Sequence, residues 1–271
     1  MLFGLYNQII PFWIGFLILI NQKNNKSIGL IYASLFLYSP FPCVTLAPVV
    51  IYMIFKNYSN ENVKTIEKVK SALSIQNIAS VPLFVIIATF IVSNNSARKI
   101  ELLKLDKSNM FLLLAFLVTE VIVYLIFVYN KKDIILNILI ITTIITSFVV
   151  MGDSYDFAWR TAIPLSFYLM LLTIKYLNNT HVNKMKKRLL IVLICIGALT
   201  PLSEISRTLR CEYNVIKGKD PAMSDSLDSI FEKDNNDCRN NFISDDSNSI
   251  FFNYIAKQNT EDEYERFTNN R

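Results

Sequence analysis

Hydrophobic residues are gathered into long blocks that short polar stretches separate. A helix that crosses the hydrocarbon core of a bilayer needs about 20 mostly apolar residues. Seven blocks approach or exceed that length: residues 2–20, 28–55, 77–92, 110–129, 134–151, 161–177 and 189–205. The pattern predicts an all-α fold, a polytopic transmembrane helix bundle of about seven spans.

The second block, residues 28–55, is too long for one plain helix and holds Ser39-Pro40-Phe41-Pro42 near its middle. Proline removes a backbone hydrogen bond and disfavours helix at the residue before it. Two interpretations are open, a sharply kinked span or two half-helices that form a re-entrant segment. Broken backbone at membrane depth survives where it is buried in protein or lines a wet cavity.

Composition excludes most soluble proteins. Hydrophobic residues make up 52% of the 271 positions and charged residues 18%, where soluble domains carry about 25% charged residues. There is no Walker loop, dinucleotide fingerprint, CxxC pair or local Ser-His-Asp signature. The single histidine, His181, argues against a histidine-built metal centre, and the residues themselves predict no metal site.

The net charge of +5 hides a division of the chain. Residues 211–271 hold seven basic and 13 acidic residues, a net of −6, which leaves 20 basic and nine acidic residues, a net of +11, in residues 1–210. We therefore expect a transmembrane domain over 1–210 and a small, polar, acidic tail over 211–271.

Basic residues also predict the orientation, because they concentrate in cytoplasmic loops. Loops 56–76, 129–133 and 178–188 hold four, two and four of them and fall on one side of the bundle. If residues 28–55 are re-entrant, loop 21–27 joins that side. We expect a multi-pass protein of the cell membrane with loop 152–160 and the tail outside the cytoplasm. Nucleic-acid binding has no support, because the orientation already explains the basic residues.

The tail contains two cysteines, Cys211 and Cys238. On an oxidising side of the membrane they could form a disulfide. Two free thiols fit the spacing equally well, so both alternatives stay open.

The outer loop between the fifth and sixth spans brings charged and aromatic residues together: Asp153, Asp156, Trp159 and Arg160. One interpretation is a local i, i+4 pair of Asp156 with Arg160 beside an interfacial aromatic belt. The other is a binding site in which Arg160 holds a phosphate bidentately. In that site Asp156 orients Arg160 or binds a sugar hydroxyl, and Trp159 offers a ring face.

Two further charged sites lie in or beside spans, where charges are costly and usually face a partner or a wet cavity. Glu120 stands near the middle of the fourth span. It either bonds to a neighbouring helix or serves as a proton relay or a partner for Arg160. Glu204 and Arg207, at the outer end of the last span, either pair with each other at i, i+3 or join the Asp156–Arg160 group.

Residues 155–164 read Y-D-F-A-W-R-T-A-I-P. They resemble an N-D-F-x-M-R-x-S-I-P pattern of large bacterial polytopic membrane proteins that accompany surface-polysaccharide genes and look related to GT-C type glycosyltransferases. Other segments resemble the same family: Ser39-Pro40-Phe41, Glu120, residues 197–201 with Glu204 and Arg207, and the tail segments 241–243 and 251–257. The chain departs from the pattern at Tyr155 and Trp159, which replace its Asn and Met.

The resemblance implies glycosyl transfer from a polyprenyl-phosphate-linked sugar at the outer membrane face, with a divalent cation or basic side chains at the diphosphate. GT-C enzymes carry an acidic catalytic residue in the loop after the first span, whereas loop 21–27 has no acid. We therefore expect this chain to correspond to the C-terminal portion of such a protein, with an upstream-encoded membrane segment as partner. The alternatives are a transporter or flippase for a lipid-linked saccharide, and a non-catalytic membrane scaffold.

Overall fold

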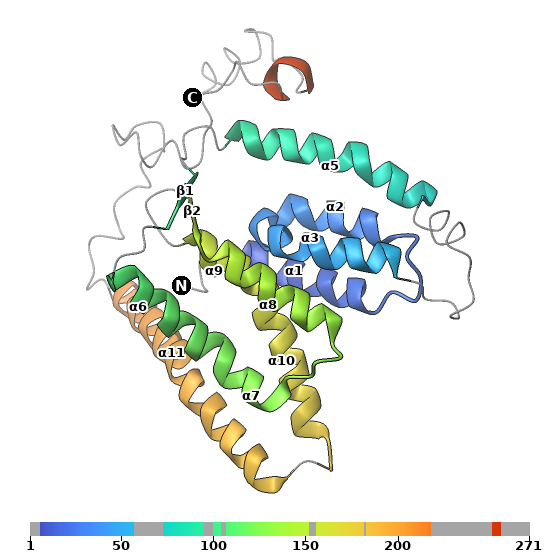
Figure 1. Cartoon of the computed structure of the whole chain (residues 1–271). Helices are drawn as coiled ribbons and strands as arrows, with labels where there is room; N and C mark the ends of the chain where they lie inside the picture. The colour runs from blue at the N-terminus through green and yellow to red at the C-terminus, as the bar shows by residue number, and fades with distance from the viewer. Residues whose placement is uncertain are drawn as a thin grey trace. The chain divides into compact units, whose positions relative to one another are not determined.

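The computed structural model describes residues 6–56, 73–94, 100–103, 107–151, 156–181, 183–217 and 251–255. These residues are mostly helical, as the sequence predicts (Figure 1). The elements are α1 (Tyr6–Ile20), α2 (Ile28–Tyr38), α3 (Pro40–Phe55), α5 (Ile75–Asn94), β1 (Ile100–Leu102), α6 (Lys107–Leu117), the π-helix η2 (Val118–Ile122), α7 (Val123–Val128), α8 (Ile134–Thr146), β2 (Val149–Met151), α9 (Asp156–Thr161), α10 (Ile163–Asn178), α11 (Lys184–Ile216) and the π-helix η4 (Phe251–Ile255).

Three helices are long and apolar enough to cross a membrane, by length and composition: Ile75–Ser93, Asn109–Val128 and Lys184–Asn214. They contain the predicted third, fourth and seventh spans. The other predicted spans contain apolar helices of 10–17 residues, such as α8 and α10. The three long helices are barely covered by protein, with 17%, 6% and 6% of their most apolar windows buried.

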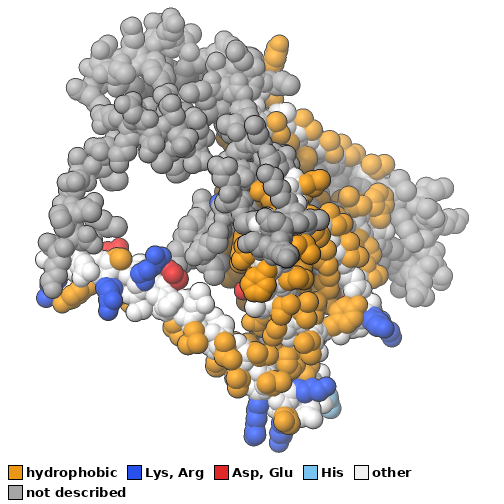
Figure 2. Space-filling model, turned by 60° about the vertical axis from the view of Figure 1, so that its left-hand side comes forward, with side chains coloured by type: hydrophobic (Ala, Val, Ile, Leu, Met, Phe, Trp, Pro, Cys, Tyr) orange, Lys and Arg blue, Asp and Glu red, His pale blue; other side chains and the backbone are white. Residues whose placement is uncertain are grey.

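Hydrophobic side chains cover much of the described surface on the face that Figure 2 shows. Large ones are exposed along whole helices, among them Ile14 at 55%, Phe111 at 71% and Leu199 at 64%. Single exposed apolar residues are ordinary, but contiguous exposed apolar helix surfaces mark contact with lipid or protein. The described helices are therefore those of a protein suited to a membrane.

The chain divides into two compact units. Unit 1 comprises Met1–Ala115, Asn130–Tyr168 and Ile243–Arg271, and unit 2 comprises Phe116–Tyr129 and Leu169–Phe242. Helix α11 continues through residue 210, where we expected the transmembrane domain to end, to Ile216. Most of the predicted tail, including Cys238, lies outside the described residues. Cys211 is described and carries an exposed free thiol.

Unit 1 is built around a helical hairpin made of α2 and α3. Helix α2 ends at Tyr38, Ser39 adopts φ −141° and ψ 66°, and Pro40 opens α3 in its first turn, where the missing N–H costs nothing. Tyr32 Oη donates to the carbonyl oxygen of Cys43 at 2.9 Å. Along an unbroken helix these residues would be about 16 Å apart. The proline break therefore folds α3 back on α2 (Figure 1).

Buried asparagines hold the open end of this hairpin together. Asn25, before α2, donates to the carbonyl oxygen of Ile54 at 2.7 Å. Asn77 of α5 donates to the carbonyl oxygen of Asn25 and accepts from the amide of Gly29, both at 2.8 Å. The start of α2 and the end of α3 thus lie at one end of unit 1. The structure therefore has two half-helices that fold back on each other and not one kinked helix.

The opposite end of unit 1 holds the hairpin tip and the β pair. Ser39 Oγ donates to the carbonyl oxygen of Gln8 near the start of α1. Strands β1 and β2 pair antiparallel, with Ile100 opposite Met151 and Leu102 opposite Val149. The core between the two ends consists of fully buried side chains of α1, α3, α8 and α10: Phe12, Phe16, Leu19, Leu46, Val49, Met53, Leu136, Leu139 and Leu165.

Unit 2 contains the end of α6, η2, α7, most of α10, and α11. Tyr176 of α10 meets Phe127 of α7 edge to face, with ring centroids 6.3 Å apart. The ammonium of Lys187 donates to the carbonyl oxygen of Leu177 at 2.7 Å. This bond links the start of α11 to the end of α10. Its 33 residues make α11 about 50 Å long, which exceeds the roughly 30 Å hydrocarbon core.

Candidate functional site

Arg160 lies on α9, a six-residue helix that precedes α10. Pro164 follows in the first turn of α10, where proline is tolerated. Phe157 and Ala158 are each 8% exposed, and Thr161 and Ala162 are buried. One face of α9 is thus embedded in unit 1, and Arg160 is half-buried at its edge.

Thr45 of α3 ties α9 to the hairpin. Its hydroxyl is fully buried and donates to the carbonyl oxygen of Thr161 at 2.6 Å. Thr142 of α8 donates in turn to the carbonyl oxygen of Thr45 at 3.3 Å. Because α3, α8 and α9 are joined at this one residue, the position of Arg160 is fixed relative to the hairpin.

The guanidinium of Arg160 lies over the ring of Phe41, 5.4 Å from its centroid. Phe157 meets the same ring edge to face at 5.7 Å with an interplanar angle of 87°. Phe41 belongs to the proline-broken tip of the hairpin and Arg160 to the 155–164 motif. Two segments on which the family resemblance rests, about 120 residues apart, are therefore in contact in the structure.

This arrangement suits anion binding. A guanidinium stacked on an aromatic face keeps its planar fork of N–H donors in a fixed orientation. A phosphate accepts two such donors at once, which a lysine ammonium cannot reproduce.

The other predicted members of the outer-loop site are only partly described. Trp159 is 45% exposed on the outer face of α9. Asp156 is the first residue of α9, which agrees with a helix start there, but its side chain lies outside the described part of the chain. Asp153 lies outside it altogether. The Asp156–Arg160 pair remains a prediction.

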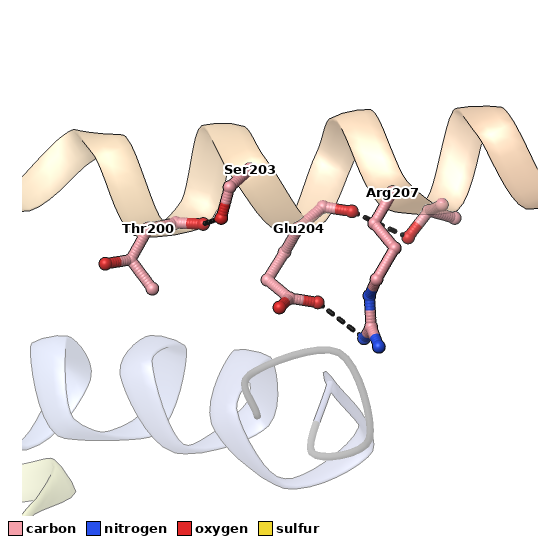
Figure 3. A network of polar contacts seen from close by, with 5 residues as sticks. Thr200, Ser203, Glu204 and Arg207 are labelled. Atoms are coloured by element: carbon pink, nitrogen blue, oxygen red, sulfur yellow. Dashed lines mark hydrogen bonds and ion pairs between the residues drawn. The ribbon is translucent and has the colours of Figure 1, made fainter.

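Glu204 and Arg207 form a salt bridge with each other on α11 (Figure 3). Arg207 Nη2 donates to Glu204 Oε2 at 2.6 Å, and the two side chains are 73% and 29% exposed. This is the local i, i+3 pair that the sequence allows. Both residues belong to unit 2, whereas Arg160 belongs to unit 1, so their membership of one site remains a prediction.

Glu120 lies in the π-helical turn η2, between α6 and α7. It is exposed within unit 2 and sits one turn before Tyr124. The phenol oxygen of Tyr124 lies 3.5 Å from the position that a Cβ on Gly197 of α11 would occupy. π-turns inside α-helices occur often at functional sites. The partner proposed for Glu120, Arg160, belongs to the other unit.

No group of three or more His, Cys, Asp or Glu that could hold a metal ion is found among the described residues. The described residues that contact or position Arg160 include Phe41, Phe157 and Thr45. The carboxylates of Asp153 and Asp156 lie outside the described part of the chain, so the divalent cation that the resemblance implies stays a prediction. We therefore derive no step through a metal.

Sequence reasoning missed Thr45, Thr142 and Phe157, which position Arg160. A threonine inside an apolar block usually bonds to its own helix, so these residues carry no separate signal in the sequence. Phe157 was visible only as one aromatic among several near the motif. The chain matches no protein-family model, no curated protein and no solved structure.

Proposed function

We propose that the chain is a multi-pass membrane protein with six crossings and one re-entrant hairpin, in place of seven spans. The crossings are α1, α5, the continuous α6–α7 helix, α8, α10 and α11. The hairpin contacts of Asn25 and Tyr32 support this count, because they return the chain to the end at which α2 begins.

The ends of unit 1 support the predicted orientation. Loop 21–27, Lys56 and loop 130–133 lie at one end, since Asn25 bonds to Ile54 and Lys56 lies with Lys132 around one cavity. The hairpin tip, the β pair and α9 lie at the other. By the positive-inside rule the lysine end faces the cytoplasm. Arg160, α11's last turns and the tail are then outside.

Labelling of single cysteines tests this orientation in a variant that lacks the four native ones. Cysteines at Asn24 and Asn130 should resist a membrane-impermeant maleimide applied to whole cells, and a cysteine at Ser154 should react. Labelling of the cysteine at position 24 without labelling of the one at position 154 would show that the orientation is the reverse of the predicted one. Labelling of Asn24 and protection of Asn130 would contradict the re-entrant hairpin.

For the activity, we propose that Arg160 binds the diphosphate of a polyprenyl-linked sugar in bacterial envelope glycan assembly, in a GT-C-like glycosyl transfer. The observation that carries this proposal is the guanidinium held over Phe41 at the tip of the re-entrant hairpin. An arginine fixed in a partly apolar setting at the outer membrane face suits a lipid-borne phosphate.

Arg160→Lys tests the activity. It keeps the charge and loses the bidentate fork, so we expect surface glycan to fall at least tenfold while the protein is still present in the membrane. Arg188→Lys, at an exposed position near the start of α11, is the matched control and should retain the glycan. Wild-type glycan in the Arg160→Lys strain would overturn the proposal.

A transporter or flippase for a lipid-linked saccharide is the second candidate. The π-turn at Glu120 favours it, because a carboxyl group on a locally widened helix could take up and release a proton. Glu120→Gln separates the two. Under this candidate the lipid-linked sugar accumulates on the cytoplasmic leaflet, whereas under glycosyl transfer it still reaches the outer leaflet.

A further inference from the structure

A polar cavity of about 350 Å³ opens at the lysine end of unit 1, at the opposite end from Arg160. The end of α3, the 130–133 turn, the start of α8 and Tyr168 of α10 line it. Its lining residues are Tyr52, Lys56, Asn130, Lys132, Asp133, Ile134, Ile135 and Tyr168. Two of them carry a positive charge and one a negative charge.

The one carboxylate in this lining is already engaged by the protein. Asp133 Oδ1 caps α8 by accepting from the amide of Leu136 at 3.1 Å. Asp133 Oδ2 accepts from the phenol of Tyr168 at 2.9 Å. Because both oxygens have protein donors, Asp133 repels an anion less than a solvated carboxylate does, and the two lysines set the sign of the cavity.

The turn that presents Lys132 is fixed by its own hydrogen bonds. Asn130 Oδ1 accepts from the amide of Lys132 at 3.0 Å, and the amide of Asp133 donates to the carbonyl oxygen of Asn130 at 3.0 Å. Asn137 of α8 donates to the carbonyl oxygen of Lys131 at 3.1 Å. On the other side, the Lys56 ammonium lies 5.7 Å from the centroid of the Tyr52 ring. The backbone of the cavity is thus organised before a ligand arrives.

An apolar surface adjoins the cavity. Ile51 and Phe55 of α3 are 57% and 59% exposed, and Ile134, in the lining itself, is 48% exposed. A free phosphate would gain nothing from these side chains. A phospholipid would place its phosphate between the lysines and its acyl chains along them, as basic pockets between membrane helices do.

We propose that this cavity is a binding site for an anionic glycerophospholipid, with the headgroup phosphodiester between Lys56 and Lys132. The proposal rests on the membrane location of the chain and not on the glycan role of Arg160. The ligand chemistry is a phosphate diester at the polar edge of the bilayer, such as that of phosphatidylglycerol or cardiolipin.

Native mass spectrometry of the full chain in detergent tests the site, with cardiolipin titrated against phosphatidylcholine. Lys56→Gln with Lys132→Gln should weaken cardiolipin binding about 25-fold, because each lysine near a membrane surface contributes about fivefold. The control is Lys184→Gln with Lys186→Gln, which removes the same charge from the exposed first turn of α11 in unit 2. It should bind as the wild type does. Lys56→Arg with Lys132→Arg should also retain binding.

Equal loss in the two double Gln variants, or equal binding of phosphatidylcholine, would overturn the proposal. Displacement of cardiolipin by millimolar inorganic phosphate would also overturn it and indicate a site for a soluble anion. If the double variant unfolds in detergent, the single variants carry the test with about fivefold losses each. Arg160→Lys should bind cardiolipin normally, so failure here and failure of the glycan proposal are distinguishable.

Discussion

The contacts that stabilise the interior of unit 1 differ in kind from those within unit 2. In unit 1, side chains bond to backbone that is distant in sequence, as Asn77 does to Asn25 across 52 positions and Thr45 to Thr161 across 116. In unit 2, most of the side-chain hydrogen bonds of α11 are local, as between Glu204 and Arg207 or between Thr208 and Glu204, and the bond from Lys187 to Leu177 reaches only the preceding helix. Most fully buried side chains also belong to unit 1.

This difference in contacts follows from the arrangement of the helices in each unit. A helical hairpin such as α2–α3 brings helix ends into the interior, where their backbone groups need partners that only other segments supply. A long continuous helix such as α11 satisfies its own backbone and leaves its apolar side chains to lipid. Replacement of a polar residue by an apolar one should therefore be costly in unit 1 and tolerated in unit 2.

Asn77→Leu should have the largest effect. It removes the amide that donates to the carbonyl oxygen of Asn25 and accepts from the amide of Gly29. Each of these buried backbone groups would lose its partner, which costs about 1–3 kcal/mol per group. We expect a loss of about 3 kcal/mol or more in the free energy of unfolding, measured by SDS titration in mixed micelles. Asn179→Leu, which removes an exposed local bond to the amide of His181 in unit 2, should cost less than about 1 kcal/mol. Equal losses of stability in Asn77→Leu and Asn179→Leu would contradict the proposed difference between the units.

Two glycine substitutions give the next largest contrast. A Cβ on Gly29 would lie 2.7 Å from Ser80 Oγ and 3.0 Å from Asn77 Oδ1. We expect Gly29→Ala to cost about 1–3 kcal/mol, since overpacking at a buried site forces its neighbours apart. Gly197→Ala in α11 meets only Tyr124 Oη at 3.5 Å and should be neutral or stabilise by up to about 1 kcal/mol through helix propensity. The same SDS titration measures both, and a destabilised Gly197→Ala would show that unit 2 is as tightly packed there as unit 1.

Thr45→Val should cost about 1 kcal/mol, because it keeps the shape of the side chain and removes the hydroxyl bonded to Thr161. Since that bond positions α9, surface glycan should fall as well, though less than in Arg160→Lys. Thr208→Val on α11 removes a local bond to the carbonyl oxygen of Glu204 and is the control. It should change neither stability nor glycan. A wild-type amount of glycan in a folded Thr45→Val protein would show that the activity does not depend on this bond to α9.

The features that the sequence predicts well are those that one short segment determines. Pro40 and Pro42 predict the break between α2 and α3, because proline acts on its own turn. The i, i+3 spacing of Glu204 and Arg207 predicts their salt bridge. The lysine loops predict that residues 56–76 and 129–133 lie on one side, and Lys56 and Lys132 do line one cavity of unit 1.

The features that the sequence does not predict depend on distant partners. Asn25 and Asn77 read as polar residues at the edges of apolar blocks, and nothing local indicates that they bond to each other. Whether residues 28–55 kink or fold back was open for the same reason, since the asparagines and Tyr32 decide it. The π-turn at Glu120 is also invisible, because one widened turn leaves the hydrophobic pattern unchanged. Phe41 beneath Arg160 is the part of the site that only the fold reveals.

Glu204→Gln should have the smallest effect, although it breaks the shortest side-chain ion pair described for α11. The pair joins neighbouring turns of one helix, and Arg207 is 73% exposed, so solvent and salt screen it. Exposed pairs of this kind contribute about 0.2–1 kcal/mol. We expect the SDS midpoint of Glu204→Gln to lie within error of the wild type at 0.5 M NaCl and slightly below it at low salt. A loss that persists at high salt would mean that Glu204 has a further partner shielded from solvent. That result would favour the predicted group with Asp156 and Arg160 over the local pair.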